Sequence, residues 1–216
     1  MTSRNINSRA AATSIEVVAD ELIALARIVD RFMDVPRATM RHDRAETDGE
    51  HTLRLQFIAV SYAARFHPEL DLGKVSLYAL VHDFVEVYAG DVNSLKATSD
   101  AIAKKTQTEK AAFEQLEHEL GDLWPDLIGL LKRYEELEDS EARFVKCLDK
   151  CDPSFTHYAN RGQALMNMGL IDYDEFTELC ERVRVRVMTY AHEFPDVMEL
   201  REELISRVAQ TAYTPV

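Results

Sequence analysis

Three ionisable side chains interrupt an otherwise apolar stretch, LYALVHDFVEVYAGD, in the middle of the chain. His82 and Glu86 are four residues apart and would share one face of a helix, with Asp83 adjacent to both. Charged groups in such a helix are costly unless they are paired or bound to a metal. The stretch therefore indicates either a buried ion pair or a metal-dependent catalytic site.

Two further segments carry candidate metal ligands. His51 lies at the start of an apolar helix directly after Glu50, and Asp149 interrupts another apolar helix, ARFVKCLDKCD. With His82 and Asp83 they supply two imidazoles and two carboxylates, a mixed nitrogen and oxygen set that suits Mn, Fe, Co, Ni or Zn better than calcium. On residue types alone, a core histidine paired with a carboxylate is an equal alternative.

The elements that must position these residues are helical. Glycine (7 residues) and proline (6 residues) are scarce and alternating β-branched runs are nearly absent, so the hydrophobic spacing predicts helices almost throughout. We expect a single all-α domain of about eight helices, with polar loops over 37–48 and 90–99. The expected helices lie between Ser14 and Pro36, over about 49–66, 72–88, 100–120, 125–137 and 141–158, after Asp172, and from Pro195 to near Tyr213.

The charge balance limits the partners. In 216 residues, 25 Lys and Arg stand against 38 Asp and Glu, a net charge of −13. Nucleic-acid polymers and anionic membranes attract proteins through a positive field, so neither is an expected partner. A small phosphorylated ligand needs only a local positive site, and Arg37, Arg41 and Arg44 form the one dense basic cluster, just before His51.

The compartment is expected to be the cytoplasm. The three cysteines show no disulfide-framework spacing. The N-terminal segment lacks the apolar core of a secretory signal, and no apolar run approaches the roughly 20 residues of a membrane helix.

Three segments in order carry a resemblance to a known family. The series His51, His82-Asp83 and Asp149 resembles the H…HD…D signature of the HD-domain metal-dependent phosphohydrolases. The stretch VHDFVEVYAGD is similar to the HD–xx–E–xxx–GD pattern of the YfbR-like 5′-deoxynucleotidase subgroup, and DGEHTLR and EDSEARFVKCLDKCDP resemble its segments with the first histidine and the last aspartate. The resemblance covers about 37–152, and the helices over 172–213 are expected to pack on that core within one domain, 1–216.

The resemblance implies roles for particular residues. It implies one divalent ion (Co, Mn, Zn, Ni, Fe or Mg, with Co or Mn favoured for activity) held by His51, His82, Asp83 and Asp149. Glu86 and Asp91 match the acidic pair beside the catalytic water. Arg37 lies close to the position of a phosphate-contacting arginine, and Arg41 or Arg44 are alternatives because the intervening loop is hard to align.

The resemblance implies hydrolysis of deoxynucleoside 5′-monophosphates to deoxynucleosides and phosphate. Two alternatives stay open: a deoxynucleoside triphosphate triphosphohydrolase, and a non-catalytic nucleotide-binding HD module. Two other HD branches match less well. Glu86 is followed by valine rather than the aspartate of guanosine tetraphosphate hydrolases, and His118 is the single histidine between Asp83 and Asp149, too few for a two-metal phosphodiesterase.

Several further expectations are structural. The subgroup implies a homodimer. An apolar stripe in the C-terminal part, made of Phe176, Leu179, Val183, Val187 and Tyr190, is expected to face the core more often than a partner. His67, His118 and His192 are expected in solvent, and the role of His42 is open. Candidates for stacking on a base are Phe32, Met33, Trp124 and Phe155.

Overall fold

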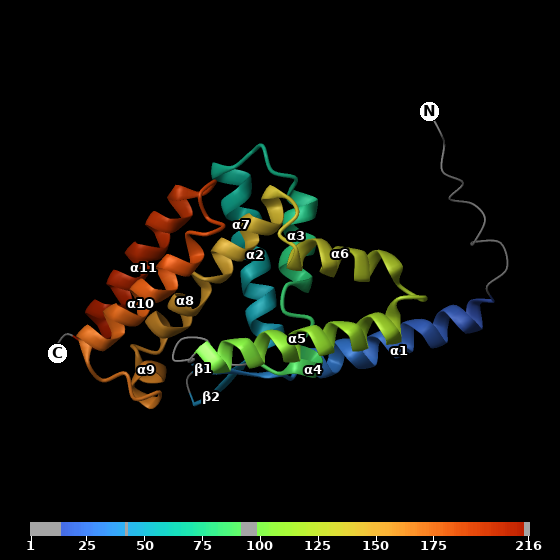
Figure 1. Cartoon of the computed structure of the whole chain (residues 1–216), viewed down its shortest axis with the longest axis horizontal. Helices are drawn as coiled ribbons and strands as arrows, with labels where there is room; N and C mark the ends of the chain where they lie inside the picture. The colour runs from blue at the N-terminus through green and yellow to red at the C-terminus, as the bar shows by residue number, and fades with distance from the viewer. Residues whose placement is uncertain (1–13, 42, 92–98, 214–216) are drawn as a thin grey trace.

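The computed structural model describes residues 14–41, 43–91 and 99–213, which form eleven helices and one two-stranded sheet (Figure 1). The helices are α1 (Ile15–Met33), α2 (Asp48–Phe66), α3 (Leu72–Val81), α4 (Glu86–Ala89), α5 (Ser99–Leu120), α6 (Pro125–Glu135), α7 (Ser140–Asp149), α8 (Asp152–Ala159), α9 (Gln163–Asn167), α10 (Tyr173–Val187) and α11 (Pro195–Tyr213). The predicted all-α class is confirmed. The helices outnumber the expected eight because two predicted helices are broken and α9 was not predicted.

Side-chain caps begin the helices that carry the site. At the start of α2, Thr47 accepts a hydrogen bond from the backbone N–H of Glu50 at 3.3 Å, and Glu50 accepts one from the backbone N–H of Thr47 at 3.1 Å. This reciprocal pair satisfies two donors that the first turn leaves free. The capping box therefore fixes the turn in which His51 lies.

The helix predicted over 72–88 is wrong, because the chain leaves the helix at His82. α3 ends at Val81, four residues form tight turns, and the short α4 follows. Within the break, the N–H of Phe84 donates to the carbonyl of Val81 at 3.0 Å and the N–H of Glu86 to that of Asp83 at 2.8 Å. His82 and Asp83 therefore lie at a helix end rather than along a helix.

The helix predicted over 141–158 is also wrong, since it divides at Lys150 and Cys151. α7 ends at Asp149, and Pro153 occupies the first turn of α8. Proline has no N–H and fits the first turn of a helix, whereas inside a helix it removes a hydrogen bond and kinks or breaks the helix, so it favours a new helix start here. Asp149, like His82, therefore lies at a helix end.

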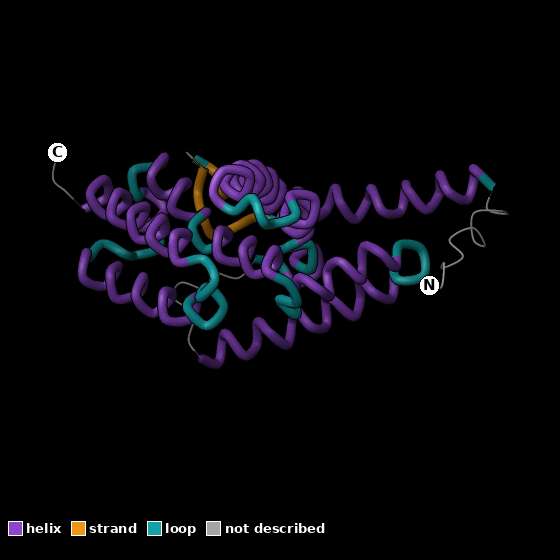
Figure 2. The backbone as a smooth tube through the Cα atoms, turned by 90° about the horizontal axis from the view of Figure 1, so that it is seen from above, coloured by secondary structure: helices purple, strands orange, loops and turns teal. Residues whose placement is uncertain are grey.

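The arginine-rich loop predicted over 37–48 is wrong as well. β1 (Pro36–Arg41) and β2 (Arg44–Thr47) pair antiparallel, with Met40 opposite Ala45 and an irregular register toward Pro36. Figure 2 shows the two strands lying among the helices. The polar sequence hides the hairpin because its buried residues are themselves polar: Thr39 donates to Glu46 at 2.9 Å inside the protein.

The main core is built around α2 and α3, which pack on each other and on α7. A smaller core lies between α9, α10 and α11 and contains Leu165, Leu170, Phe176, Leu179, Val208 and Ala209. The C-terminal stripe faces these cores: Phe176, Leu179 and Val187 are buried, and Val183 and Tyr190 pack against the main core. In Figure 1, α8, α10 and α11 gather at the end of the molecule away from α1 and α6. Within the described ranges, every helix is too short or too polar to cross a membrane.

Candidate active site

The four sequence-predicted metal ligands converge on one point. His51 comes from the first turn of α2, His82 and Asp83 from the break after α3, and Asp149 from the end of α7. One ligand atom from each lies within 4.8 Å of those of the other three. His51 Nε2 is 2.9 Å from His82 Nε2 and 3.2 Å from Asp149 Oδ1, and His82 Nε2 is 3.0 Å from Asp83 Oδ2.

These separations fit a single divalent cation. Ligands about 2.1 Å from a cation and at right angles to each other are about 3.0 Å apart, close to most of the observed spacings. Two buried imidazole nitrogens that face each other at 2.9 Å must share either a proton or a cation. Burial alone would lower the pKa of His51, but hydrogen bonds to Asp149 and Asp152 outweigh it and raise the pKa to about 9. The donor set thus favours a cation at this point.

Each histidine is oriented through its other ring nitrogen. Nδ1 of His51 lies 2.7 Å from Asp152 Oδ2, and Nδ1 of His82 lies 2.9 Å from the backbone carbonyl of Ala79. Both partners accept hydrogen bonds, so each Nδ1 carries a proton, and each Nε2 would present its lone pair to a cation bound in the cluster. Residue patterns did not identify Asp152, although it follows Asp149 by three residues in the same motif segment.

A buried ionic network connects Asp152 to the hairpin. Arg54 on α2 donates from Nε to Asp152 Oδ1 at 2.9 Å and also pairs with Glu46 on β2. Glu46 in turn accepts hydrogen bonds from Thr39 at 2.9 Å and from Thr156 at 3.2 Å. The network ties the hairpin to α2 and α8, and so holds β1 beside the four ligands.

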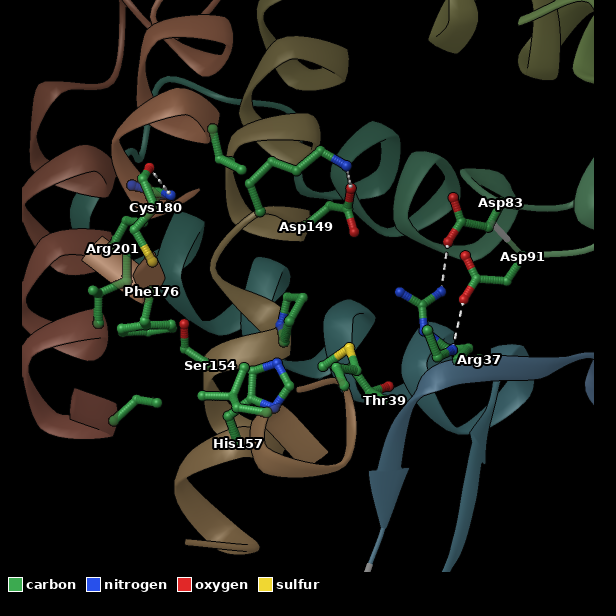
Figure 3. Close-up of a pocket in the computed structure, with 18 of the residues that line it drawn as sticks. Arg37, Thr39, Asp83, Asp91, Asp149, Ser154, His157, Phe176, Cys180 and Arg201 are labelled. Atoms are coloured by element: carbon green, nitrogen blue, oxygen red, sulfur yellow. Dashed lines mark hydrogen bonds and ion pairs between the residues drawn. The ribbon is translucent and has the colours of Figure 1, made fainter. Parts of the chain in front are cut away.

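Arg37 on β1 extends into the site, and Figure 3 shows it pointing at Asp83. Its Nη1 donates to Asp48 at 2.9 Å and to Asp83 at 3.0 Å, and the side chain is 11% exposed. Arg37, Asp83 and Asp149 line one cavity beside the cluster. Arg41 does not line it; Arg41 is half exposed and pairs with Glu50 at 3.1 Å. Arg44 is likewise bonded to Glu50, at 2.6 Å. The structure brings Arg37 to the four ligands and leaves the other two arginines outside.

Glu86 and Asp91 line the same cavity as Arg37, Asp83 and Asp149. Burial, reinforced by the nearby carboxylates of Asp83, Asp48 and Asp91, raises the pKa of Glu86 to about 11. Asp91 accepts a hydrogen bond from the backbone N–H of Ala38 at 3.0 Å, which draws it to the hairpin (Figure 3). The two acids thus lie on the side of the cluster that faces Arg37.

Two lysines and an aspartate near the cluster were not identified from the sequence. Lys150 donates to Asp149 Oδ2 at 2.6 Å, and Lys105 lies 3.6 Å from Glu86; both line the cavity. Asp48 is fully buried, and burial and the charge of Asp83 raise its pKa to about 6. The sequence around Asp48, Lys105 and Lys150 shows no distinguishing pattern, so these residues are identified only by their contacts in three dimensions.

The exposure of the histidines outside the cluster agrees only in part with the prediction. His118 and His192 are exposed, as expected. His67 is not in solvent: its side chain is 12% exposed, contacts the rings of Phe144 and Phe194, and lies 2.9 Å from Asp196. His42 lies outside the described residues, as does most of the 90–99 loop. His157, which no motif pointed to, is buried in the wall of the cavity.

None of the four aromatic or methionine candidates for base stacking lines the cavity. Phe32 is buried against Phe84, Trp124 packs against the main core, and Phe155 lies in a separate depression beside Met40. The cavity is lined instead by residues of α8 to α11, where the sequence shows no motif.

Comparison with known proteins places these observations in a family. A family model described as the HD domain matches residues 29–188, well over half of the chain. A Xenopus laevis protein named 5′-deoxynucleotidase HDDC2 is 29% identical over 217 residues, covering 95% of this chain and 98% of that protein.

One more sequence relative and one solved structure are also similar to this chain. A Salmonella paratyphi B protein named 5′-deoxynucleotidase YfbR is 30% identical over 127 residues, 51% of this chain and 64% of its own length, so the chain spans less than two thirds of it. The crystal structure of a predicted metal-dependent phosphohydrolase from Magnetospirillum magnetotacticum matches with a TM-score of 0.65 at 24% identity, covering 92% of this chain and 98% of that one. At that identity the structure supports the shared fold.

Proposed function

The chain belongs to the HD domain family, and we propose that it hydrolyses deoxynucleoside 5′-monophosphates to deoxynucleosides and phosphate. Relatives that match over half of the chain or more carry the name 5′-deoxynucleotidase. The observation that carries the proposal is the cavity itself. It contains the guanidinium of Arg37 beside the four-ligand cluster and the two acids.

His51, His82, Asp83 and Asp149 would hold one divalent cation. When bound there, the cation polarises a phosphoryl oxygen and lowers the pKa of a coordinated water, the chemistry that phosphate hydrolysis requires. Cobalt or manganese is our proposal for the active metal, since two imidazoles with two carboxylates suit either ion.

Arg37 is positioned to bind the phosphate. Its guanidinium is held by Asp48 and Asp83 through Nη1, at 2.9 and 3.0 Å. Arginine presents a planar fork that matches phosphate oxygens, and a guanidinium that is paired through Nη1 still offers its other N–H groups. Arg37 would therefore orient the phosphate beside the cluster and offset the charge that develops on it.

Glu86 and Asp91 would move the protons. Hydrolysis forms a bond from water oxygen to phosphorus and breaks the bond to the 5′-oxygen, which takes up a proton as it leaves. In the absence of a cation the raised pKa of Glu86, about 11, keeps the side chain protonated. A neighbouring cation favours its ionised form, which can accept a proton from the attacking water. Asp91 would then orient the water or protonate the leaving oxygen.

A product analysis over nucleotides tests this function. The purified protein is incubated with each deoxynucleoside mono- and triphosphate in the presence of manganese or cobalt, and the products are separated by ion-exchange chromatography. We expect inorganic phosphate and deoxynucleoside from the monophosphates. Release of intact triphosphate, with no turnover of monophosphates, would support the triphosphohydrolase alternative, and binding without turnover under several metals would support the non-catalytic module.

The homodimer and the cytoplasmic location stay predictions. Sedimentation equilibrium of the purified chain measures the first. Among soluble oligomers, two-fold symmetric dimers are the commonest form. A mass of one chain at micromolar concentration would contradict it.

A further inference from the structure

The cavity that contains Arg37, Asp83 and Asp149 continues toward the C-terminal helices (Figure 3). Its far wall is apolar and is built mainly by the smaller core, which turns one face toward the site. The apolar residues of this wall are Leu165, Met168, Phe176, Ile205 and Val208. One continuous cavity thus joins a charged end to an apolar end.

Two buried polar groups interrupt the apolar end. His157 on α8 is 7% exposed, and its Nδ1 has no hydrogen-bond partner among the described residues. Arg201 on α11 is 3% exposed; its Nη1 and Nη2 donate to Glu202 and to the carbonyl of Cys180, while Nε has no partner within the same ranges. Buried polar groups are nearly always satisfied, so two unsatisfied groups at one cavity indicate a missing polar ligand.

The helix α8 runs from the charged end of the cavity toward its apolar end. Asp152, which contacts His51, and His157 lie five residues apart on α8, a rise of about 7.5 Å along the helix. Ser154 lines the cavity between them. A ligand with its phosphate at the cluster would therefore extend along α8 toward His157.

We propose that the apolar end binds the base of the nucleotide, with His157 and Arg201 contacting its hydrogen-bonding edge. The inference rests on the proposed function for the position of the phosphate. A flat heterocycle fits between apolar side chains such as Phe176, and its polar edge supplies partners for the two unsatisfied nitrogens. The nucleobase is the chemical class that has both properties.

The two side chains differ in the hydrogen bonds that they can form with a base. Arg201 Nε carries a hydrogen and can only donate, so it requires an acceptor on the base. Burial lowers the pKa of His157 to about 4, so its ring is neutral at physiological pH and Nδ1 donates or accepts according to the tautomer. A buried polar group left without its partner discriminates strongly between similar ligands, so these two residues set base preference.

Substitutions at His157 separate its hydrogen bond from its packing. His157→Leu puts an apolar side chain in place of the imidazole and removes both ring nitrogens, whereas His157→Asn retains a polar group near the position of Nδ1. Arg201→Lys keeps the charge and removes the Nε–H. His118→Leu, on the exposed face of α5, is the matched control.

The first measurement compares substrates with and without a base. kcat/KM is determined for the four deoxynucleoside 5′-monophosphates and for 2-deoxyribose 5-phosphate, which has the same scissile bond. We expect His157→Leu and Arg201→Lys to lower kcat/KM about tenfold for at least one nucleotide, through KM, and to leave 2-deoxyribose 5-phosphate unchanged. His157→Asn should recover part of the loss. Equal losses on both kinds of substrate, or none on either, would overturn the base site.

The second measurement is independent of hydrolysis. Calorimetry measures binding of the four unphosphorylated deoxynucleosides to wild type and to the variants. We expect wild type to bind at least one of them, and His157→Leu to weaken that binding about tenfold. If wild type releases no phosphate but shows this pattern, the proposed function fails and the base site stands. Absence of binding, or equal binding by all variants, overturns the base site whatever the hydrolysis result.

Discussion

Asp152 lies 2.7 Å from Nδ1 of His51, and this contact determines which ring nitrogen faces the other three ligands. The carboxylate is itself held by Arg54, whose Nε donates to it at 2.9 Å. Burial alone would raise the pKa of Asp152, but hydrogen bonds from His51 and Arg54 keep the pKa below its usual value. The carboxylate therefore stays charged and keeps the proton of His51 on Nδ1.

Replacing Asp152 by asparagine is expected to weaken metal binding about 10- to 100-fold, the usual effect of losing such a partner. An amide can donate to Nδ1 and thereby place the ring proton on Nε2, where the ligand lone pair is needed. Calorimetric titration of manganese into the metal-free protein measures the loss. Asp196→Asn is the matched control, since Asp196 contacts His67 at 2.9 Å outside the cluster. Equal affinities for wild type and Asp152→Asn would contradict the orienting role.

Arg37 and Arg41 should differ sharply as sites of substitution. Arg37→Lys removes the planar fork beside the cluster and is expected to lower kcat/KM for a nucleotide about 10- to 100-fold. Arg41→Lys, which alters a half-exposed pair with Glu50, should change it less than about twofold. Steady-state phosphate release measures both. A larger effect at Arg41 than at Arg37 would reassign the phosphate contact.

Glu86→Gln tests the proton acceptor without removing a proposed metal ligand. The amide has nearly the same shape but cannot accept a proton from water, so kcat is expected to fall about 10²- to 10⁴-fold. Manganese affinity should stay close to that of wild type. Retention of kcat with normal metal binding would exclude Glu86 as the base and direct attention to Asp91.

The burial of His157 in its neutral form should make the free energy of unfolding depend on pH. Burial lowers its pKa from 6.5 to about 4, so between those values the unfolded chain binds the proton more tightly than the folded one. The free energy of unfolding should therefore fall as the pH drops from 6.5 to 4, by up to about 3 kcal/mol from this group. Urea unfolding at several pH values, compared between wild type and His157→Asn, isolates the effect, and His192→Asn serves as the exposed control. Parallel pH profiles for wild type and His157→Asn would contradict it.

The sequence located the four converging residues because each belongs to a local motif, but it misjudged the elements that hold them. The pattern LYALVHDFVEVYA reads as one helix since Phe84 and Val85 in the break are buried like their helical neighbours. A run of buried residues does not distinguish a helix from a buried turn. The end of α7 had a local signal in Pro153, which the predicted continuous helix did not take into account.

The hairpin and the far end of the cavity depend on long-range contacts. Glu46 is polar and reads as part of a loop, yet it is buried because Arg54 and Thr156 satisfy it, the latter 110 residues away. His157 and Arg201 stand in helices without a family motif, and only the packing of α8 against α11 brings them to one cavity. Such partners cannot be paired from spacing along one chain.

The central claim is that a cation held by His51, His82, Asp83 and Asp149 enables hydrolysis of a nucleotide 5′-phosphate. Phosphate release from deoxynucleoside monophosphates is the most direct measurement, made on chelator-treated protein before and after manganese or cobalt is restored, for wild type and Asp83→Ala. We predict no release by the chelated protein, recovery with metal for wild type, and none for Asp83→Ala at any metal concentration. Equal release by wild type and Asp83→Ala, or release that is indifferent to the chelator, would contradict the claim.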